Sequence, residues 1–201
     1  MNEVQIVDLR RMYLDHLLRF QQKYHRVLPF SEMIVDRWEK ARLLGFGENA
    51  SIYDSAIVYG DVHVGEQSWI GPQVILDGAA APVRIGAWCS ISAAVHIYTH
   101  DSVAWAISGG KAAYSSAPVN IGDNVYIGPM TVIAKGVTIG NGCIIGAHSF
   151  VNSDIPAHSA AWGSPARVVG RVVVRENGAG YDIESLNDSQ TLNPQETPCA
   201  E

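Results

Sequence analysis

The 201-residue sequence has little cysteine, no excess of basic residues and no long apolar run. Its three cysteines are too few for a disulfide framework, so we expect them to fill the core of a protein in a reducing, cytoplasmic compartment. A formal net charge of -6 argues against a nucleic-acid binder, whose surface should be basic. No stretch is long enough to cross a bilayer, and nothing near the N-terminus resembles a signal peptide. The length suits one substantial core with appendages.

What the sequence does contain is a repeat of six residues. From Ile121 to Pro156 it runs IGDNVY, IGPMTV, IAKGVT, IGNGCI, IGAHSF and VNSDIP. A period of six fits neither a helix nor an irregularly turning strand, so the phrase itself must be the structural unit. We predict a parallel β-helix in which each phrase supplies a short strand and a corner, the first aliphatic residue points inward, and three phrases complete a triangular coil. Glycine or asparagine in the second and fourth places suits sharp corners with positive φ. Cys89 and Cys143, in the fifth place, should also point inward.

The repeat begins at Ile52 and is interrupted twice. Ile85 lies fifteen residues after Ile70, which is two phrases and three residues, and this slip predicts a small bulge between Asp77 and Arg84. The second interruption is longer, because 24 residues separate the inward residue of one phrase from that of the next. This excursion, residues 98–120, carries aromatic and glycine residues. Long loops inside compact domains are usually functional or disordered, and this composition favours function.

The chain divides into three parts: a helical cap over residues 1–46, the β-helix over 50–172, and a polar tail over 176–201 that we expect to be disordered. The first helix is expected over residues 3–25, where apolar side chains share one face: Val4, Val7, Leu14, Leu17, Leu18 and Tyr24. A second helix is expected to run to Leu44 with Ser31 as N-cap, and its inward residues should be Ile34, Trp38 and Ala41. We expect the two helices to cover the open end of the β-helix, the alternative being a role in binding a substrate or partner.

Among the seven histidines, His100 has the most informative position. It stands in YTHDS, where the coil ends and the excursion begins. The prism can hold a histidine there rigidly while its imidazole faces a groove under the loop, as a general base near neutral pH requires. A structural role is the default for a lone histidine, but the position at the long interruption favours function.

The sequence resembles the hexapeptide-repeat acyltransferases, in particular the small acetyltransferases that act on sugars, antibiotics and related acceptors. The motifs that carry the resemblance, over roughly residues 50–172, are the IGxxxx phrases, THD at 99–101, IGDNVYIGPMTVIAKGVTIG, GAHSFVNSDIP and WGSPARVVG. The resemblance implies a mainly β fold, a left-handed parallel β-helix with N-terminal helices and a long inserted loop. The general crossover rule alone would favour a right-handed coil.

The resemblance also implies a homotrimer with acetyl-CoA as co-substrate in a groove between neighbouring prisms. His100 matches the general base, which takes a proton from a hydroxyl or amine of a sugar-type acceptor as that group attacks the thioester. The expected reaction is therefore direct acetyl transfer without an acyl-enzyme, with polysaccharide biosynthesis as the expected context. No nucleic acid and no metal is expected to take part.

Several residues match cofactor contacts of that family or could replace them. Ala147 matches a backbone contact to the pantetheine arm, and Arg167 in GSPAR matches a basic residue at the phosphates, which suits its forked donors. Asn152 and Ser153 stand where many members have Thr-Lys, so one phosphate contact is missing or moved. Lys135, Arg171 or both are expected to replace it, the alternative for Lys135 being a solvated corner residue.

The excursion supplies the candidates for acceptor binding. Trp105 and Tyr114 could stack on a sugar ring, although exposed aromatic residues at a trimer seam would look the same. Asp101 could orient His100 or anchor the loop through hydrogen bonds, and the anchor is the favoured interpretation.

Two other functions remain open at this stage. A β-helix enzyme like carbonic anhydrase needs three histidines at a trimer seam, for which His63, His96 and His100 are the candidates. Counting phrases places His63 and His96 on different prism faces, which argues against that site. A non-enzymatic trimeric scaffold would predict flat, repeated faces without the excursion and without GSPAR. Serine acetyltransferases are closer to the predicted fold than either of these alternatives. The resemblance to them is limited, because their helical N-terminal region is much larger than the one in this chain.

Overall fold

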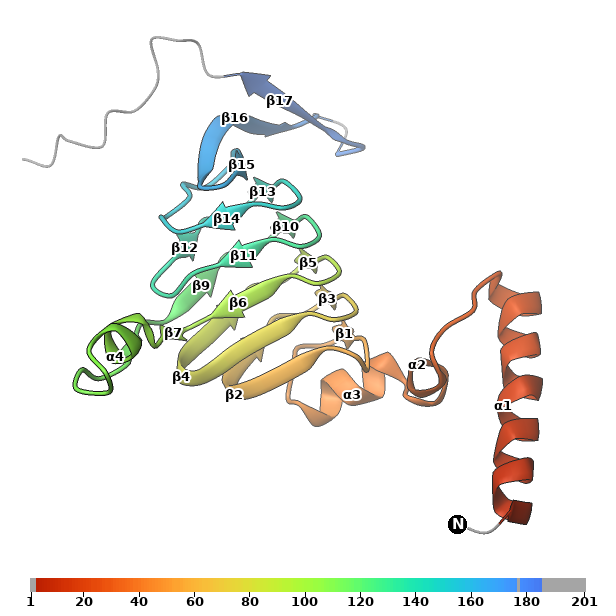
Figure 1. Ribbon diagram of the computed structural model, residues 1–201. Coiled ribbons are helices and arrows are strands. Elements are labelled where there is room, and N and C mark those ends of the chain that lie inside the picture. The colour runs from red at the N-terminus through yellow and green to blue at the C-terminus, as the bar shows by residue number, and fades with distance from the viewer. Residues whose placement is uncertain (1–2, 177, 186–201) are drawn as a thin grey trace, which may run out of the picture.

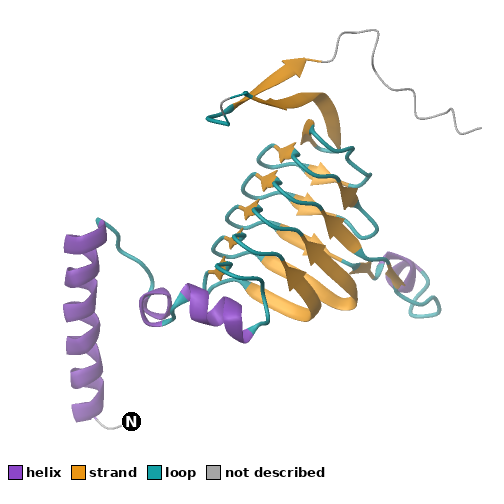
Figure 2. Ribbon diagram, turned by 180° about the vertical axis from the view of Figure 1, so that it is seen from behind, coloured by secondary structure: helices purple, strands orange, loops and turns teal. Residues whose placement is uncertain are grey.

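The computed structural model describes residues 3–176 and 178–185, and its centre is a triangular stack of short parallel strands (Figure 1). Figure 2 shows the same stack from behind, with the N-terminal helices at one end and antiparallel strands at the other. The strands of the stack are β1 (Ser51–Ile52), β2 (Ile57–Val64), β3 (Trp69–Ile70), β4 (Ile75–Ile85), β5 (Ser90–Ile91), β6 (His96–Tyr98), β9 (Val119–Ile121), β10 (Tyr126–Ile127), β11 (Val132–Ile133), β12 (Thr138–Ile139), β13 (Ile144–Ile145) and β14 (Phe150–Val151).

Three phrases complete each coil, as predicted. Ile127 of β10 lies in register between Ile91 of β5 and Ile145 of β13, and the other two faces stack in the same way. The inward aliphatic side chains are buried and form one continuous core, against which Val58 packs partly buried. Cys89 and Cys143 are buried in that core, as their place in the phrase predicted.

The second-place glycines owe their presence to the neighbouring coil rather than to positive φ. A Cβ on Gly140 would lie 2.5 Å from the backbone nitrogen of Ala157, closer than real Cβ contacts come. Positive φ occurs instead in the fourth place, at Asn124, Met130 and His148. The expectation of left-handed backbone is therefore wrong for the second place and confirmed for the fourth.

The bulge predicted between Asp77 and Arg84 is confirmed. Gly60 of β2 pairs with Gly78 of β4, but Val62 pairs with Val83, so residues 79–82 of β4 stand opposite a single residue of β2. β4 then turns a corner, since its first residues pair with β6 and its last with β9. His63 pairs with the last part of β4 and His96 with its first residue. The two histidines therefore lie on different faces of the prism, as the count of phrases predicted.

The excursion is a small ordered subdomain on the side of the stack. It consists of β7 (His100–Asp101), α4 (Val103–Ile107) and β8 (Ser115–Ser116), and β7 and β8 pair antiparallel. Figure 1 shows α4 standing out from the prism beside β7 and β9. None of the five apolar residues of α4 is buried.

The N-terminal region forms α1 (Glu3–Tyr24), α2 (Phe30–Ile34) and α3 (Arg37–Leu43) rather than two helices. The expected second helix is broken because Asp36 caps α3, where its side chain accepts hydrogen bonds from the amides of Trp38 and Glu39 at 2.9 Å. Ser31 is therefore not an N-cap. The prediction that Ala41 faces inward is confirmed, but Ile34 and Trp38 are exposed.

Two buried or half-buried charges fasten this region to the first coil. Glu32 accepts hydrogen bonds from the amides of Asp54 and Ser55, both at 2.9 Å. Lys40 of α3 donates from Nζ to three backbone carbonyls of the first coil, those of Tyr53, Asp54 and Ala56. The end of the prism is thus covered by α3, which lies under β1 (Figure 1).

α1 does not cover the β-helix, contrary to expectation. It stands apart from the prism (Figures 1 and 2), and Val7, Leu14 and Leu18 on its apolar face are exposed. Its contacts run to α2, where the rings of Tyr13 and Phe30 meet edge to face at 5.3 Å. Within the described residues, no helix is long and apolar enough to cross a membrane.

The other end of the stack closes with antiparallel strands. β15 (Ser159–Gly163) adds to β13 in parallel, and β16 (Ala166–Val174) and β17 (Tyr181–Ser185) follow as antiparallel neighbours. Residues 181–185 were expected to be disordered and instead form β17, because Ile183 and its neighbours pair with β16. The rest of the expected tail, residues 186–201 with Cys199, lies outside the described residues.

Candidate functional site

His100 lies at the point where the chain leaves the prism, on β7. Its side chain is 30% exposed, yet its Nδ1 atom is buried and has no hydrogen-bond partner among the described residues. Oδ2 of Asp77 lies 3.1 Å from Nδ1, at hydrogen-bond distance but too poorly aligned for a hydrogen bond. Because Nδ1 faces the interior, Nε2 is the ring nitrogen that can serve a substrate.

Asp77 is a site residue that the sequence argument missed. Its side chain is 8% exposed, and Oδ1 accepts a hydrogen bond from the amide of Ala79 at 3.1 Å. Thr99, next to His100, donates from its hydroxyl to the carbonyl of Asp77 at 2.7 Å and accepts from the amide of Ala81 at 3.3 Å. The slip in the repeat was the available signal, because Asp77 is the residue at which the bulge begins.

Asp101 makes the contacts of a loop anchor. Its Oδ1 accepts a hydrogen bond from the amide of Val103 at 3.0 Å, and its Oδ2 pairs with Nζ of Lys135. The hydrogen bond from Lys135 and that from Val103 lower the pKa of the Asp101 carboxyl. Lys135, which we expected to meet the coenzyme phosphates, therefore already has a carboxylate partner at the foot of the excursion.

Two aromatic residues of the excursion extend outward from His100, Tyr114 next to the imidazole and Trp105 next to Tyr114. The Tyr114 ring lies parallel to the imidazole, with an interplanar angle of 3° and centroids 6.3 Å apart. Trp105 meets Tyr114 edge to face at 5.8 Å. The side chains of Trp105 and Tyr114 are 45% and 55% exposed, so their faces are open to an acceptor or to a neighbouring molecule.

The remaining cofactor candidates lie on two corners of the prism. Ala147 occupies the corner between β13 and β14, and Asn152 and Ser153 follow β14 at the next corner. That second corner also holds Lys135 one coil earlier, since β11 and β14 pair in register. Arg167, on β16, donates to the carbonyl of Ala166 at 2.8 Å. One chain does not gather all five residues around one point.

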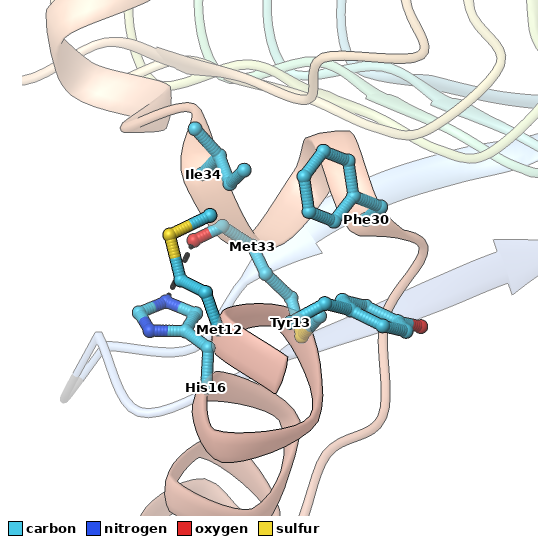
Figure 3. A pocket seen from close by; sticks show the side chains of 6 residues that line it. All are labelled: Met12, Tyr13, His16, Phe30, Met33 and Ile34. Carbon is cyan, nitrogen blue, oxygen red and sulfur yellow. Dashed lines mark hydrogen bonds between the residues drawn. The ribbon is translucent and has the colours of Figure 1, made fainter. Parts of the chain in front are cut away.

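A mainly apolar hollow of about 260 Å³ lies between α1 and α2 (Figure 3). Its only histidine, His16, lies at hydrogen-bond distance from the carbonyl of Met33, 3.0 Å from Nε2. The lining residues are Met12, Tyr13, His16, Phe30, Met33 and Ile34. With that ring nitrogen engaged and no charged group in the lining, the hollow offers no counterpart to the His100 site. Among the described residues, no group of three His, Cys, Asp or Glu side chains could hold a metal ion.

A family model of bacterial transferase hexapeptides, in six repeats, matches residues 118–153. The galactoside O-acetyltransferase of Escherichia coli is 48% identical over 73 residues, which are 35% of this chain and 36% of that protein. The chain thus spans about a third of the length of the curated relatives it matches.

Solved structures extend the likeness to most of the chain. A hexapeptide-repeat acetyltransferase from Vibrio cholerae matches with a TM-score of 0.58 and 27% identity, over 83% of this chain and 92% of that one, and it has also been solved with acetyl-CoA. A maltose O-acetyltransferase from Clostridium difficile matches with a TM-score of 0.54 and 26% identity, over 85% and 89% of the chains. These matches confirm the left-handed β-helix and the resemblance to the hexapeptide-repeat acetyltransferases.

Proposed function

We propose that this protein is an acetyl-CoA-dependent acetyltransferase that acetylates a hydroxyl or amine of a sugar-type acceptor, with His100 as general base. The observation that carries the proposal is the position of His100. It stands at the long interruption of a hexapeptide prism, with one ring nitrogen buried near a carboxylate, the Tyr114 ring parallel to its imidazole and Trp105 against Tyr114. The acceptor class is supported by relatives that are named for galactoside and maltose acetylation.

The reaction is a direct displacement. The acceptor oxygen or nitrogen attacks the thioester carbonyl of acetyl-CoA while its proton passes to Nε2 of His100. The C–S bond then breaks, and the coenzyme leaves as a thiol after taking that proton from the imidazolium. The protein contributes the base and holds the two substrates in line, which replaces a bimolecular encounter by an oriented one.

A homotrimer with sites between subunits completes the proposal. One prism face presents outward side chains that are mostly apolar and stacked in register, whereas the next face carries polar ones. His100 lies just beyond the edge of the apolar face, whose ladder is Ile57, Ile75, His96, Val132 and Phe150. Packing against a second copy would bury this ladder and give the exposed aromatic residues of the excursion a neighbour. Acetyl-CoA would lie in the same seam, with Ala147, Asn152, Ser153 and Arg167 as its proposed contacts. A cytoplasmic location and a role in polysaccharide biosynthesis stay predictions.

Replacement of His100 by alanine tests the chemistry. Loss of the general base should lower kcat by roughly 10² to 10⁴, whereas His63→Ala, a change of an exposed histidine on another face, should leave kcat unchanged. Sugars and nucleotide sugars incubated with acetyl-CoA, followed by mass spectrometry, would identify the acceptor and separate O- from N-acetylation. Acetyl transfer by the His100→Ala protein within a few-fold of the original rate would remove His100 from the mechanism.

A further inference from the structure

The bulge in β4 is the second irregularity of the prism that leads to the candidate site, the first being the excursion that begins at His100. Residues 79–82 stand opposite a single residue of β2, and Asp77 lies at the start of the bulge, paired with Tyr98 of β6. A bulge re-aims the side chains beside it and is often found next to active sites. Here the side chain at its start is a buried carboxylate that points toward His100.

The bulge also fixes that carboxylate. The amide of Ala79, inside the bulge, donates to Oδ1 of Asp77, which leaves Oδ2 for His100. Thr99 is fully buried and ties the carbonyl of Asp77 to the amide of Ala81, so the start and the middle of the bulge are both bonded to the residue that precedes His100. A carboxylate with little exposure needs such partners, because an unpaired buried charge is costly.

We propose that the bulge of β4 is a positioning device, in which Asp77 holds the His100 imidazole in the tautomer with its proton on Nδ1. This inference rests on the proposed function of His100 and goes beyond it. Asp77 is then a positioning residue, since it acts through His100. With the proton on Nδ1, the lone pair of Nε2 is free to accept the proton of the acceptor.

The present geometry is consistent with this role. Nδ1 and Oδ2 are 3.1 Å apart and Nδ1 has no other partner among the described residues, so a small rotation of the ring would make the hydrogen bond. Catalytic hydrogen bonds are often poorly aligned before the substrates bind and tighten afterwards. When Nε2 takes the acceptor proton, the carboxylate would also stabilise the imidazolium that forms.

The test compares Asp77→Asn with Asp61→Asn. Asp61 is the control, because its Oδ1 also lies 3.1 Å from the Nδ1 of a histidine, His63, but its carboxylate is exposed and pairs with Arg84 as well. Asp77→Asn keeps the size of the side chain and removes its charge. We expect it to lower kcat by roughly 10² to 10⁴ without a matching rise in KM for acetyl-CoA. Asp61→Asn should change neither value.

A spectroscopic measurement separates this inference from the proposed function. The ¹⁵N chemical shifts of the His100 ring report its tautomer whether or not an acceptor is known, and the signals are assigned by their loss in His100→Ala. The original protein should show the proton on Nδ1, and Asp77→Asn should shift the population toward Nε2. An unchanged tautomer in folded Asp77→Asn protein would overturn the inference, even if activity were lost. A shifted tautomer in a protein without acetyl transfer would keep the positioning role and refute the proposed function alone.

Discussion

The inward aliphatic residue of each phrase gives a quantitative prediction for the stability of the stack. Ile127 has no exposed surface and lies between Ile91 and Ile145. Ile127→Ala removes three carbons, which corresponds to about 2.4 kcal/mol of transfer free energy at about 0.8 kcal/mol for each. The cavity left behind adds about 24 cal/mol per Å³ of space that the coils do not refill. We therefore expect the free energy of unfolding to fall by about 3 to 4 kcal/mol.

Ile107→Ala is the matched control, because it removes the same atoms from a side chain that is 86% exposed on α4. It should change the free energy of unfolding by less than about 0.5 kcal/mol. Urea unfolding followed by tryptophan fluorescence measures both, at one protein concentration, since the midpoint of an oligomer depends on concentration. If Ile127→Ala changed the free energy of unfolding by an amount within about 0.5 kcal/mol of that for Ile107→Ala, the first residue of each phrase would not be a rigid core position.

Other predictions follow from the corners, the cap and the excursion. Gly140→Ala should lower the melting temperature, at a cost of about 1 to 3 kcal/mol, because its Cβ would press on the backbone of Ala157; an unchanged melting temperature would mean that the corner relaxes. Glu32→Gln weakens the acceptor for two amides of the first coil, so their hydrogen exchange should speed up while that of the central coils stays the same. Lys135 lowers the pKa of Asp101, so the anchor of the excursion is fully present above the ordinary carboxyl value of 3.8 and is lost as pH falls through the lower folded value. Hydrogen exchange of the α4 amides at pH 4 should therefore rise in Lys135→Met and stay low in the original protein.

The stack could be predicted from the sequence because its order is local and repeated. A residue such as Ile133 finds its neighbours Ile97 and Val151 one coil away on the same face, so the repeat alone states which residues touch. The buried cysteines follow from the same rule. The second-place glycines were found for a partly wrong reason, because the pressure on Gly140 comes from the next coil and not from its own φ.

The N-terminal helices could be predicted only in part. α2 ends at Ile34, before the extended Val35, and Asp36 caps the start of α3; a helical pattern of apolar residues does not show such a break. The apolar face of α1 predicted burial that the chain itself does not supply. The sequence shows that one face of α1 is apolar, but it does not show which surface packs against that face.

The candidate site shows the same limit. His100 could be found because it marks the end of a regular segment. Asp77 could not be found in this way. The slip in the repeat marks its position, but only the folded coil shows that β4 lies beside β6, close to His100. Lys135 was predicted to be a phosphate contact or a solvated corner residue, and only the folded excursion places Asp101 against it.

The lysine beneath the first coil has a consequence for the length of the assembly. In the stack most amides that bond between coils donate to carbonyls of the coil after, as Tyr126 does to Cys143 at 2.9 Å, whereas corner amides such as that of Asn124 donate to the coil before. The carbonyls of the first coil have no coil before them, and Lys40 takes three of them. A prism is in principle a template that a second prism could extend end to end into a fibre. The ammonium group of Lys40 donates hydrogen bonds to three of the carbonyls with which a second prism would pair. This one side chain therefore opposes end-to-end assembly of prisms.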